Sequence, residues 1–514
     1  MQAVQTLLSN ASPVQLGAAA TALICVVLVY AWSTKIHPSS CCYPKGPPRL
    51  PLLGNSHNFP TENWGVIFNE WHKLYGDIVY VQLPGMPFYI INSLEIAQEL
   101  FNKRAKLNSE RRIGYMIMNL MGWSWLPAFM SPDALHGRIR TLFRRGIGPT
   151  KMPSKDPLIE RKAQDFVLDL QGVRGNPKST VLNTVGMIII ELAYGRGIVK
   201  EHGDEMIALN LEAMNLLEKA ILTVWTVDLI PLLRFWPSWM PGGEFKRSGA
   251  YCKQLVDRIR QWPFQMAIER HKAGTLDHCF ADDLMNEFGT SFEVRDTLAN
   301  IYFAGVDTTS TLIIRFLHTM FIYPEVTKKM QSEIDSVVGR DRSPTVKDRN
   351  DLPYSNAVWK EAIRYKCSMP LGIPHSSNED QLINGYFIPK GSIINPNFGS
   401  MLSDPNIWGD PDVFRPERFL SSDASALPDP TTLIFGFGPR ICPGMYFADR
   451  TGFHLVIAAM ALFDINPLPG ESVPHPTKVQ YLKRGMRLPV KFDCVFTPRD
   501  DKARQVLSSL ALSR

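Results

Sequence analysis

The sequence contains little cysteine, and no two cysteines have the spacing of a metal-binding pair. Only 8 of its 514 residues are Cys, and no CxxC motif occurs. This scarcity excludes a disulfide framework and argues against a zinc module. With 45% hydrophobic and 20% charged residues, the chain is neither disordered nor a short binding module. Its net charge of +6 is too dilute over this length to indicate nucleic-acid binding.

The first 34 residues carry no charged side chain, and residues 16–32 form an almost wholly apolar run. Seventeen residues are about the lower limit for a helix that crosses a bilayer. Lys35 and Lys45 follow, and the positive-inside rule then places the N-terminus across the membrane and the rest of the chain in the cytoplasm. A cleaved signal peptide is the alternative, but it would need positive charge before the run and a shorter apolar core.

Proline marks the end of this segment, in PKGPPRLPLLGN at residues 44–55. Proline cannot continue a helix, so this stretch is expected to be a stiff spacer. The sequence therefore predicts five parts. They are a lumenal N-terminus at 1–15, a transmembrane anchor at 16–34, a proline-rich hinge at 35–55, a folded body at 56–495 and a tail at 496–514.

The body is predicted to be mainly α with a minor β part. Residues 80–92 indicate two strands about a Pro-Gly turn, and residues 380–400 indicate further short strands. Residues 156–340 are mostly helical in pattern, with a long apolar stretch at 292–323 and a second helix beginning at Pro324. Residues 404–440 form a loop rich in Pro, Gly and Asp, and a helix is expected from Pro443 to Ile465.

Cys442 lies within FGFGPRICPG, residues 435–444. Glycines before it allow close approach of the backbone to a ligand, and Pro443 is expected at the first position of a helix. Unpaired amides at a helix N-terminus, together with Arg440, would lower the pKa of the thiol. One thiolate without a second Cys or His at metal spacing suits a haem iron, because the porphyrin supplies the other four ligands.

This stretch resembles the cysteine loop of the cytochrome P450 superfamily of haem-thiolate monooxygenases. Five residues stand at the family's spacing: Phe435, Gly438, Arg440, Cys442 and Gly444. The resemblance implies that Cys442 is the axial ligand of a haem b iron and that the other four residues contact the cofactor. It also implies a cytochrome P450 fold for residues 56–495, with the haem buried between a long central helix and the cysteine loop.

The resemblance extends to the stretch AGVDTTS in the predicted long helix. Small residues at Ala304 and Gly305 would leave room for a flat ligand, and Thr308 can bond back to the i−4 carbonyl. In the family, the acid and alcohol at the positions of Asp307 and Thr308 deliver protons during dioxygen activation, so these two residues are the predicted catalytic pair.

Three further residues are expected to be structural. Glu361 and Arg364 share a helix face in EAIR, and Arg418 lies in FRPERF. In the family these three form a buried network that supports the cysteine loop.

The haem propionates are expected to contact Arg140, His136 and His375. Arg140 and His136 lie in HGRIR, where family members usually carry Trp four residues before an Arg, so His136 departs from the pattern. A histidine can still donate a hydrogen bond to a propionate.

The substrate is predicted to be a hydrophobic small molecule. Residues 113–130 map to a region that commonly lines the family's substrate pocket, and they are rich in Met and Trp, although ordinary core packing explains any single one equally well. Residues 228–243 resemble fungal membrane-bound members, and Trp236 and Trp239 there could dip into the membrane. The resemblance therefore suggests secondary metabolism, with a terpenoid or polyketide as substrate.

Electrons are expected to come from NADPH through a separate flavoprotein reductase, because no GxGxxG follows a strand. The basic helix HGRIRTLFRR is the candidate docking surface, with Arg138, Arg140, Arg144 and Arg145. The predicted enzyme hydroxylates or epoxidises its substrate at the endoplasmic reticulum membrane. The alternatives are a haem-thiolate isomerase or dehydratase, a multi-step oxidase, and a catalytically idle haem-binding protein.

Overall fold

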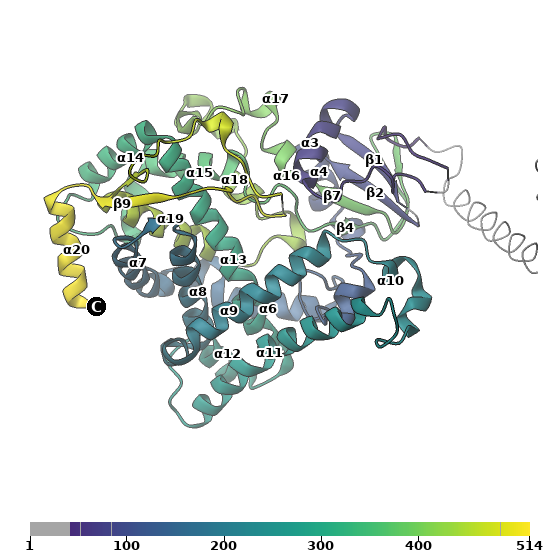
Figure 1. The fold of residues 1–514 in the computed structure, drawn as a ribbon, viewed down its shortest axis with the longest axis horizontal. Helices are drawn as coiled ribbons and strands as arrows, with labels where there is room; N and C mark the ends of the chain where they lie inside the picture. The colour runs from purple at the N-terminus through teal and green to yellow at the C-terminus, as the bar shows by residue number, and fades with distance from the viewer. Residues whose placement is uncertain (1–41, 52, 84, 484) are drawn as a thin grey trace, which may run out of the picture.

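The computed structural model describes residues 42–51, 53–83, 85–483 and 485–514. Helices surround a central helix, and a small sheet lies at one end of the molecule (Figure 1). The helices are α3 (Trp64–Tyr75), α4 (Leu94–Gln98), α5 (Ala105–Asn108), α6 (Ala134–Ile147), α7 (Asp156–Leu170), α8 (Lys178–Tyr194), α9 (Arg196–Ile221), α10 (Thr226–Leu229), α11 (Glu244–Lys272), α12 (Phe280–Phe288), α13 (Phe292–Ile322), α14 (Pro324–Val337), α15 (Pro353–Arg364), α16 (Phe398–Met401), α17 (Pro405–Trp408), α18 (Pro430–Leu433), α19 (Met445–Leu462) and α20 (Asp501–Ser513).

The strands form three small sheets. Their bounds are β1 (Ile78–Leu83), β2 (Met86–Ile91), β3 (Arg174–Gly175), β4 (His375–Ser376), β5 (Gln381–Ile383), β6 (Tyr386–Ile388), β7 (Ile393–Pro396), β8 (Phe463–Asn466) and β9 (Cys494–Pro498). Their orders are β1-β2-β7-β4, β3-β9-β8 and β5-β6. The prediction of a mainly α body with a minor β part is confirmed.

The largest sheet joins segments that lie far apart in the chain. β1 and β2 are antiparallel, with Ile78 opposite Ile91, while β7 runs parallel to β2. Alternate side chains of β1 and β2 face two separate apolar clusters, one with Phe68 of α3 and the other with Phe101. The sheet is therefore covered on both faces, and it places His375 of β4 beside β7.

Helix α13 forms the centre of the molecule (Figure 1). The Ser291 hydroxyl caps its start by accepting from the Val294 amide, and the helix ends just before Pro324. Most of its residues from Val294 onward are buried, and it packs against α6, α8, α9, α11 and α19. A helix that is apolar on nearly every face requires such surroundings.

The C-terminal region differs from the sequence expectation in two places. α19 begins at Met445 with Gly444 as its N-cap, so Pro443 precedes the helix instead of occupying its first turn. The stretch 496–514, treated as a tail, completes β9 and forms α20. Asp500 caps α20 by accepting from the Ala503 amide, and Val506 is buried at the join with α7.

The predicted anchor at 16–34, the lumenal segment at 1–15 and the first part of the hinge lie outside the described residues. Within the described part of the chain, no helix combines the length and the apolar character that crossing a bilayer requires.

Candidate active site

The cysteine loop connects α18 to α19 and is closed by its own backbone. The Cys442 amide donates to the Phe435 carbonyl at 2.8 Å, which returns the chain to the start of the loop. Gly438 has a φ of 52°, and a Cβ at this position would lie 2.4 Å from the Phe101 carbonyl oxygen. Only glycine fits such a contact without moving the backbone, so the loop is held against the segment that follows α4.

Two amides and one arginine act on the Cys442 thiol. Burial raises the pKa of this thiol, while the backbone N–H groups of Gly444 and Met445 and the charge of Arg140 act to lower it. The sequence had predicted a lowered pKa with Arg440 as the nearby cation. In the structure burial outweighs the amides, and the cation is Arg140. A bound metal ion would deprotonate a coordinating thiol outright.

Arg440 extends from the cysteine loop toward residues 109–130. Its guanidinium donates to the carbonyl oxygens of Ser109 at 2.8 Å, Pro127 at 3.0 Å and Met130 at 2.6 Å. Burial lowers its pKa to about 10. Arg440 therefore binds the cysteine loop to the segment that the sequence assigned to the substrate pocket.

His136 contacts Arg440 in this structure. An arginine can only donate, so the His136 Nε2, 3.1 Å from Arg440 Nη1, is the acceptor and the ring hydrogen is on Nδ1. Burial, with Arg440 next, lowers the pKa of His136 to about 4. In this structure the Nε2 atom therefore orients Arg440, and the donation from His136 to a propionate stays a prediction. Arg140, one turn further along α6, donates to the Ile441 carbonyl beside Cys442.

His375 and Arg111 approach the same region from the sheet side. His375 Nδ1 lies 2.7 Å from the Asn108 carbonyl, and its ring centroid is 4.4 Å from that of Phe101. Burial and the Arg111 charge lower the pKa of His375 well below its ordinary value. Arg111 donates to the Ile373 and Pro374 carbonyls. Sequence reasoning missed Arg111, because nothing in the neighbouring pair Arg111-Arg112 indicates which one points inward.

Arg111, Arg140 and Arg440 form a group that we call the Cys442 cation cluster. No residue in the described ranges forms an ion pair with any of the three. The Arg111 Nε is buried without a hydrogen-bond partner, and burial lowers the pKa of Arg111 to about 9. Clustered cations without counter-charge, beside a lone thiol, fit a cofactor that carries both carboxylates and a thiol-seeking metal. A haem with two propionates has that chemistry.

The predicted catalytic pair lies on α13 between buried turns. Thr308 and Asp307 are half-buried, and Thr308 Oγ1 donates to the Ala304 carbonyl at 2.8 Å. Ala304 is exposed although Phe303 and Val306 beside it are buried, so the helix has one accessible face here.

Gly305 is different from its predicted role. A Cβ there would lie 2.9 Å from Ile189 Cδ1, so this glycine permits close packing of α13 on α8 and does not make room for a ligand.

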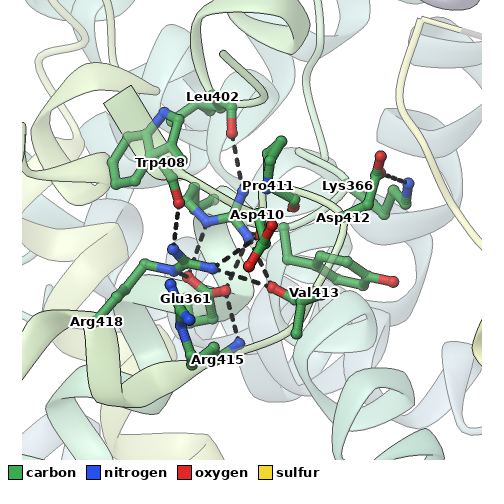
Figure 2. A network of polar contacts seen from close by, with 12 residues as sticks. Glu361, Lys366, Leu402, Trp408, Asp410, Pro411, Asp412, Val413, Arg415 and Arg418 are labelled. Carbon is green, nitrogen blue, oxygen red and sulfur yellow. Dashed lines mark hydrogen bonds and ion pairs between the residues drawn. The ribbon is translucent and has the colours of Figure 1, made fainter. Parts of the chain in front are cut away.

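Glu361, Arg364 and Arg418 come together in what we call the Glu361 network. Figure 2 shows Arg418 and Arg415 beside the Glu361 carboxylate. Both guanidinium groups bond the Glu361 carboxylate, at 2.8 Å for Arg364 and 3.1 Å for Arg418, and all three side chains are at most 4% exposed. The Arg415 amide also donates to Glu361. The remaining arginine donors reach backbone carbonyls at Leu402, Trp408, Asp410, Pro411 and Val413. This network fixes the long loop that leads to Cys442.

Most of the predicted pocket residues in 113–130 lie in the core. Met116, Met121, Trp123, Trp125 and Phe129 are buried. The ring centroids of Trp123 and Phe303 lie 4.5 Å apart, so this segment packs on α13 directly beside Ala304. In contrast Trp239 is 80% exposed and Trp236 is 38% exposed.

The chain is similar to many known proteins of one family. A family model described as cytochrome P450 matches residues 44–492. The chain is 34% identical over 484 residues to the cytochrome P450 monooxygenase COX2 of Coprinopsis cinerea, covering 92% of each chain. It is 32% identical to the cytochrome P450 monooxygenase claR of Ampulloclitocybe clavipes, covering 90% of this chain and 88% of the other. A solved zebra fish cytochrome P450 structure with abiraterone aligns with a TM-score of 0.68 and 22% identity, over 85% of this chain and all of that one.

Proposed function

This chain belongs to the cytochrome P450 family, whose matched relatives are monooxygenases, and on that premise we propose that it hydroxylates or epoxidises a hydrophobic small molecule. The observation that carries the proposal is the cysteine loop. Two backbone amides bond its thiol and the charge of Arg140 acts on it, beside a cation cluster that forms no ion pair in the described ranges. The matched relatives named above are fungal monooxygenases. We propose in addition a role in fungal secondary metabolism, with a terpenoid or polyketide as substrate.

Each residue of the site has a part in this function. Cys442 would hold the haem iron, and the Cys442 cation cluster would hold the propionates. When bound, the haem supplies the redox chemistry by which dioxygen is activated. Thr308 Oγ1 holds its proton on the Ala304 carbonyl at rest, and with the Asp307 carboxyl it would pass protons into the site from the accessible face of α13.

A reductase and a membrane are the proposed partners. On α6, Arg138 pairs with Glu293 and Arg145 with Glu287, while Arg144 is exposed and has no ion pair in the described part of the chain. This face suits an acidic NADPH-dependent flavoprotein reductase. Leu232, Phe235 and Trp239 are each more than three-quarters exposed. An exposed apolar group of this kind suits insertion into the endoplasmic reticulum membrane, from which a lipophilic substrate would enter.

The haem-thiolate assignment is tested by the spectrum of the reduced protein with carbon monoxide. Thiolate ligation predicts a Soret band near 450 nm, which Cys442→Ala should abolish. Cys279→Ala is the control, since Cys279 is a free thiol buried outside the cysteine loop and should keep the band. A band retained in Cys442→Ala would end the assignment.

The monooxygenase reaction is tested by Thr308→Ala with Thr309→Ala as the control. Thr308→Ala should bind haem and substrate normally, but a larger share of the NADPH consumed should appear as peroxide. If Thr308→Ala converts the same share of the consumed NADPH into product as the wild type does, Thr308 has no role in proton delivery. Product formed without NADPH and reductase would instead support the isomerase or dehydratase reading.

A further inference from the structure

A pair of arginines, Arg315 of α13 and Arg487 of the loop after residue 478, forms a further group of cations. Arg315 is only 2% exposed, and its Nη2 donates to the carbonyls of Tyr365 at 2.9 Å and Lys366 at 2.7 Å. Its Nε and Nη1 are buried and have no hydrogen-bond partner in the described ranges. The guanidinium carbon lies 4.7 Å from the centroid of the Tyr481 ring. Three of the five N–H donors of this arginine therefore have no partner.

Arg487 is the second member of the pair. Its backbone amide donates to the Ser368 carbonyl at 2.8 Å, and its side chain is half-buried. Its Nη2 lies 3.8 Å from the position that a Cβ of Gly65 would occupy, so the guanidinium lies at the start of α3. Burial, and then the neighbouring Arg315 charge, lower the pKa of Arg487.

No carboxylate among the described residues forms an ion pair with Arg315 or Arg487. The other two groups of inward-facing arginines contrast with this pair. Glu361 pairs with both arginines of its own network, and the Cys442 cation cluster would be matched by the proposed haem propionates. Buried charges are costly unless paired, so the Arg315–Arg487 pair calls for an anion that the described chain does not supply.

Arg315 lies on the same face of α13 as Ala304 and Thr308, beyond the accessible part of that face, because Thr311 and Arg315 are buried. Ala304, Thr308, Thr311 and Arg315 follow one another at intervals of four, three and four residues, which is the spacing of one helix face. Thr311 Oγ1 lies 3.7 Å from the sulfur of Met486, the residue before Arg487. At 1.5 Å per residue, Arg315 stands about 10 Å along the helix from Thr308.

We propose that Arg487, with Arg315 behind it, binds a carboxylate, and that the substrate is an apolar molecule bearing one. The proposal rests on the proposed function and names the substrate class of that same site. The carboxylate would pair with Arg487 and offset part of the charge of the Arg315–Arg487 pair. The apolar part would follow the α13 face past Met486 and Thr311, and the carbon to be oxidised would lie toward Thr308. Oxidation is therefore expected away from the carboxyl end.

The test measures binding to the haem-loaded protein by calorimetry at neutral pH. The probes are octanoate, octan-1-ol and acetate, which separate an apolar acid from its neutral analogue and from a small anion. Octanoate should bind at least tenfold more tightly than acetate. Arg487→Gln should weaken octanoate binding at least tenfold and leave octan-1-ol binding unchanged. Lys491→Gln, a surface cation paired with Glu471 near the same loop, is the matched control and should bind octanoate normally.

Three outcomes would overturn the proposal. If Arg487→Gln leaves the affinity for octanoate unchanged, Arg487 does not bind the carboxylate. Acetate binding as tight as octanoate binding would make this a small-anion site without a role in substrate recognition. An equal weakening of octanoate and octan-1-ol would indicate general damage to the pocket. The carbon monoxide spectrum of the same preparations keeps the two hypotheses apart, because a normal 450 nm band with any of these outcomes contradicts only the carboxylate proposal.

Discussion

The Glu361 network and the Cys442 cation cluster both gather arginines inside the protein, but only the first has an acid at its centre. In the Glu361 network every guanidinium group meets a carboxylate or a backbone carbonyl of the same chain. In the Cys442 cation cluster the arginines meet carbonyls and a histidine, but no acid of the described chain pairs with them. The first group finds its counter-charge within the polypeptide, whereas the second would find it in a ligand such as the proposed haem.

This difference separates scaffold from site. A fully paired buried network stabilises one geometry and loses much when a member is removed. A cluster with an unmet charge lowers the stability of the free protein and returns that free energy when the ligand binds. We therefore expect substitutions in the two groups to affect different measurements.

The largest effect is expected from Glu361→Gln. This change leaves Arg364 and Arg418 buried without their counter-charge, at a cost of about 3–5 kcal/mol. Urea unfolding should show a much lower midpoint, or folded protein should fail to accumulate. Glu417→Gln is the control, because Glu417 pairs with Lys329 at the surface and is 46% exposed. A Glu361→Gln midpoint equal to that of the control would contradict the scaffold role.

A loss of haem affinity is expected from Arg140→Gln. Removing one charged hydrogen-bond donor of a propionate costs about 1.5–3 kcal/mol. Haem transfer to apomyoglobin should therefore be roughly 10–100-fold faster, since each 1.4 kcal/mol is a factor of ten. The haem-stripped variant should unfold at a urea concentration no lower than that of the wild type. Arg138→Gln on the exposed side of α6 should transfer haem at the normal rate; an equally fast loss there would remove the distinction between the two arginines.

His318 offers a third case for this comparison, because it avoids the free-energy cost of burying a charge by remaining neutral. Both ring nitrogens are buried without partners in the described structure, and burial lowers the pKa to about 3 from 6.5. The unfolded chain therefore takes up a proton between those pH values while the folded chain does not, so stability falls as pH drops through this window. His318→Leu should remove about 1–2 kcal/mol of the stability difference between pH 6.5 and pH 5. Unfolding midpoints measured at both pH values test this, and an unchanged pH dependence would contradict it.

The smallest effect is expected from Lys366→Ala, at the edge of the Glu361 network. Lys366 pairs with Asp412, whose side chain is 82% exposed, and Figure 2 shows this pair apart from the central carboxylate. Exposed pairs contribute about 0–1 kcal/mol. The urea midpoint should be almost that of the wild type, and a loss comparable to that of Glu361→Gln would extend the scaffold to this surface pair.

Local patterns were enough to predict the main elements. The apolar stretch before Pro324 predicted α13, and the Pro-Gly turn predicted β1 and β2, because helix and strand signals are short in range. α20 was missed although Asp500 and the spacing of Ala503, Val506 and Leu507 are typical of a capped amphipathic helix. The pattern is present in the sequence, but it follows the segment that carries the family's motifs, so no motif indicates that this helix packs on the body.

The sequence by itself determined the cysteine loop, the central helix with Asp307 and Thr308, and the residues of the Glu361 network, because each is carried by a short motif. Only the tertiary structure decided that Arg140 acts on Cys442, that His136 orients Arg440, that Gly305 packs on α8, and that Arg111 and the Arg315–Arg487 pair are relevant. The physical reason is that the burial of a side chain, and whether a charged group finds a partner, depend on which distant segments of the chain meet. A local sequence pattern does not contain that information.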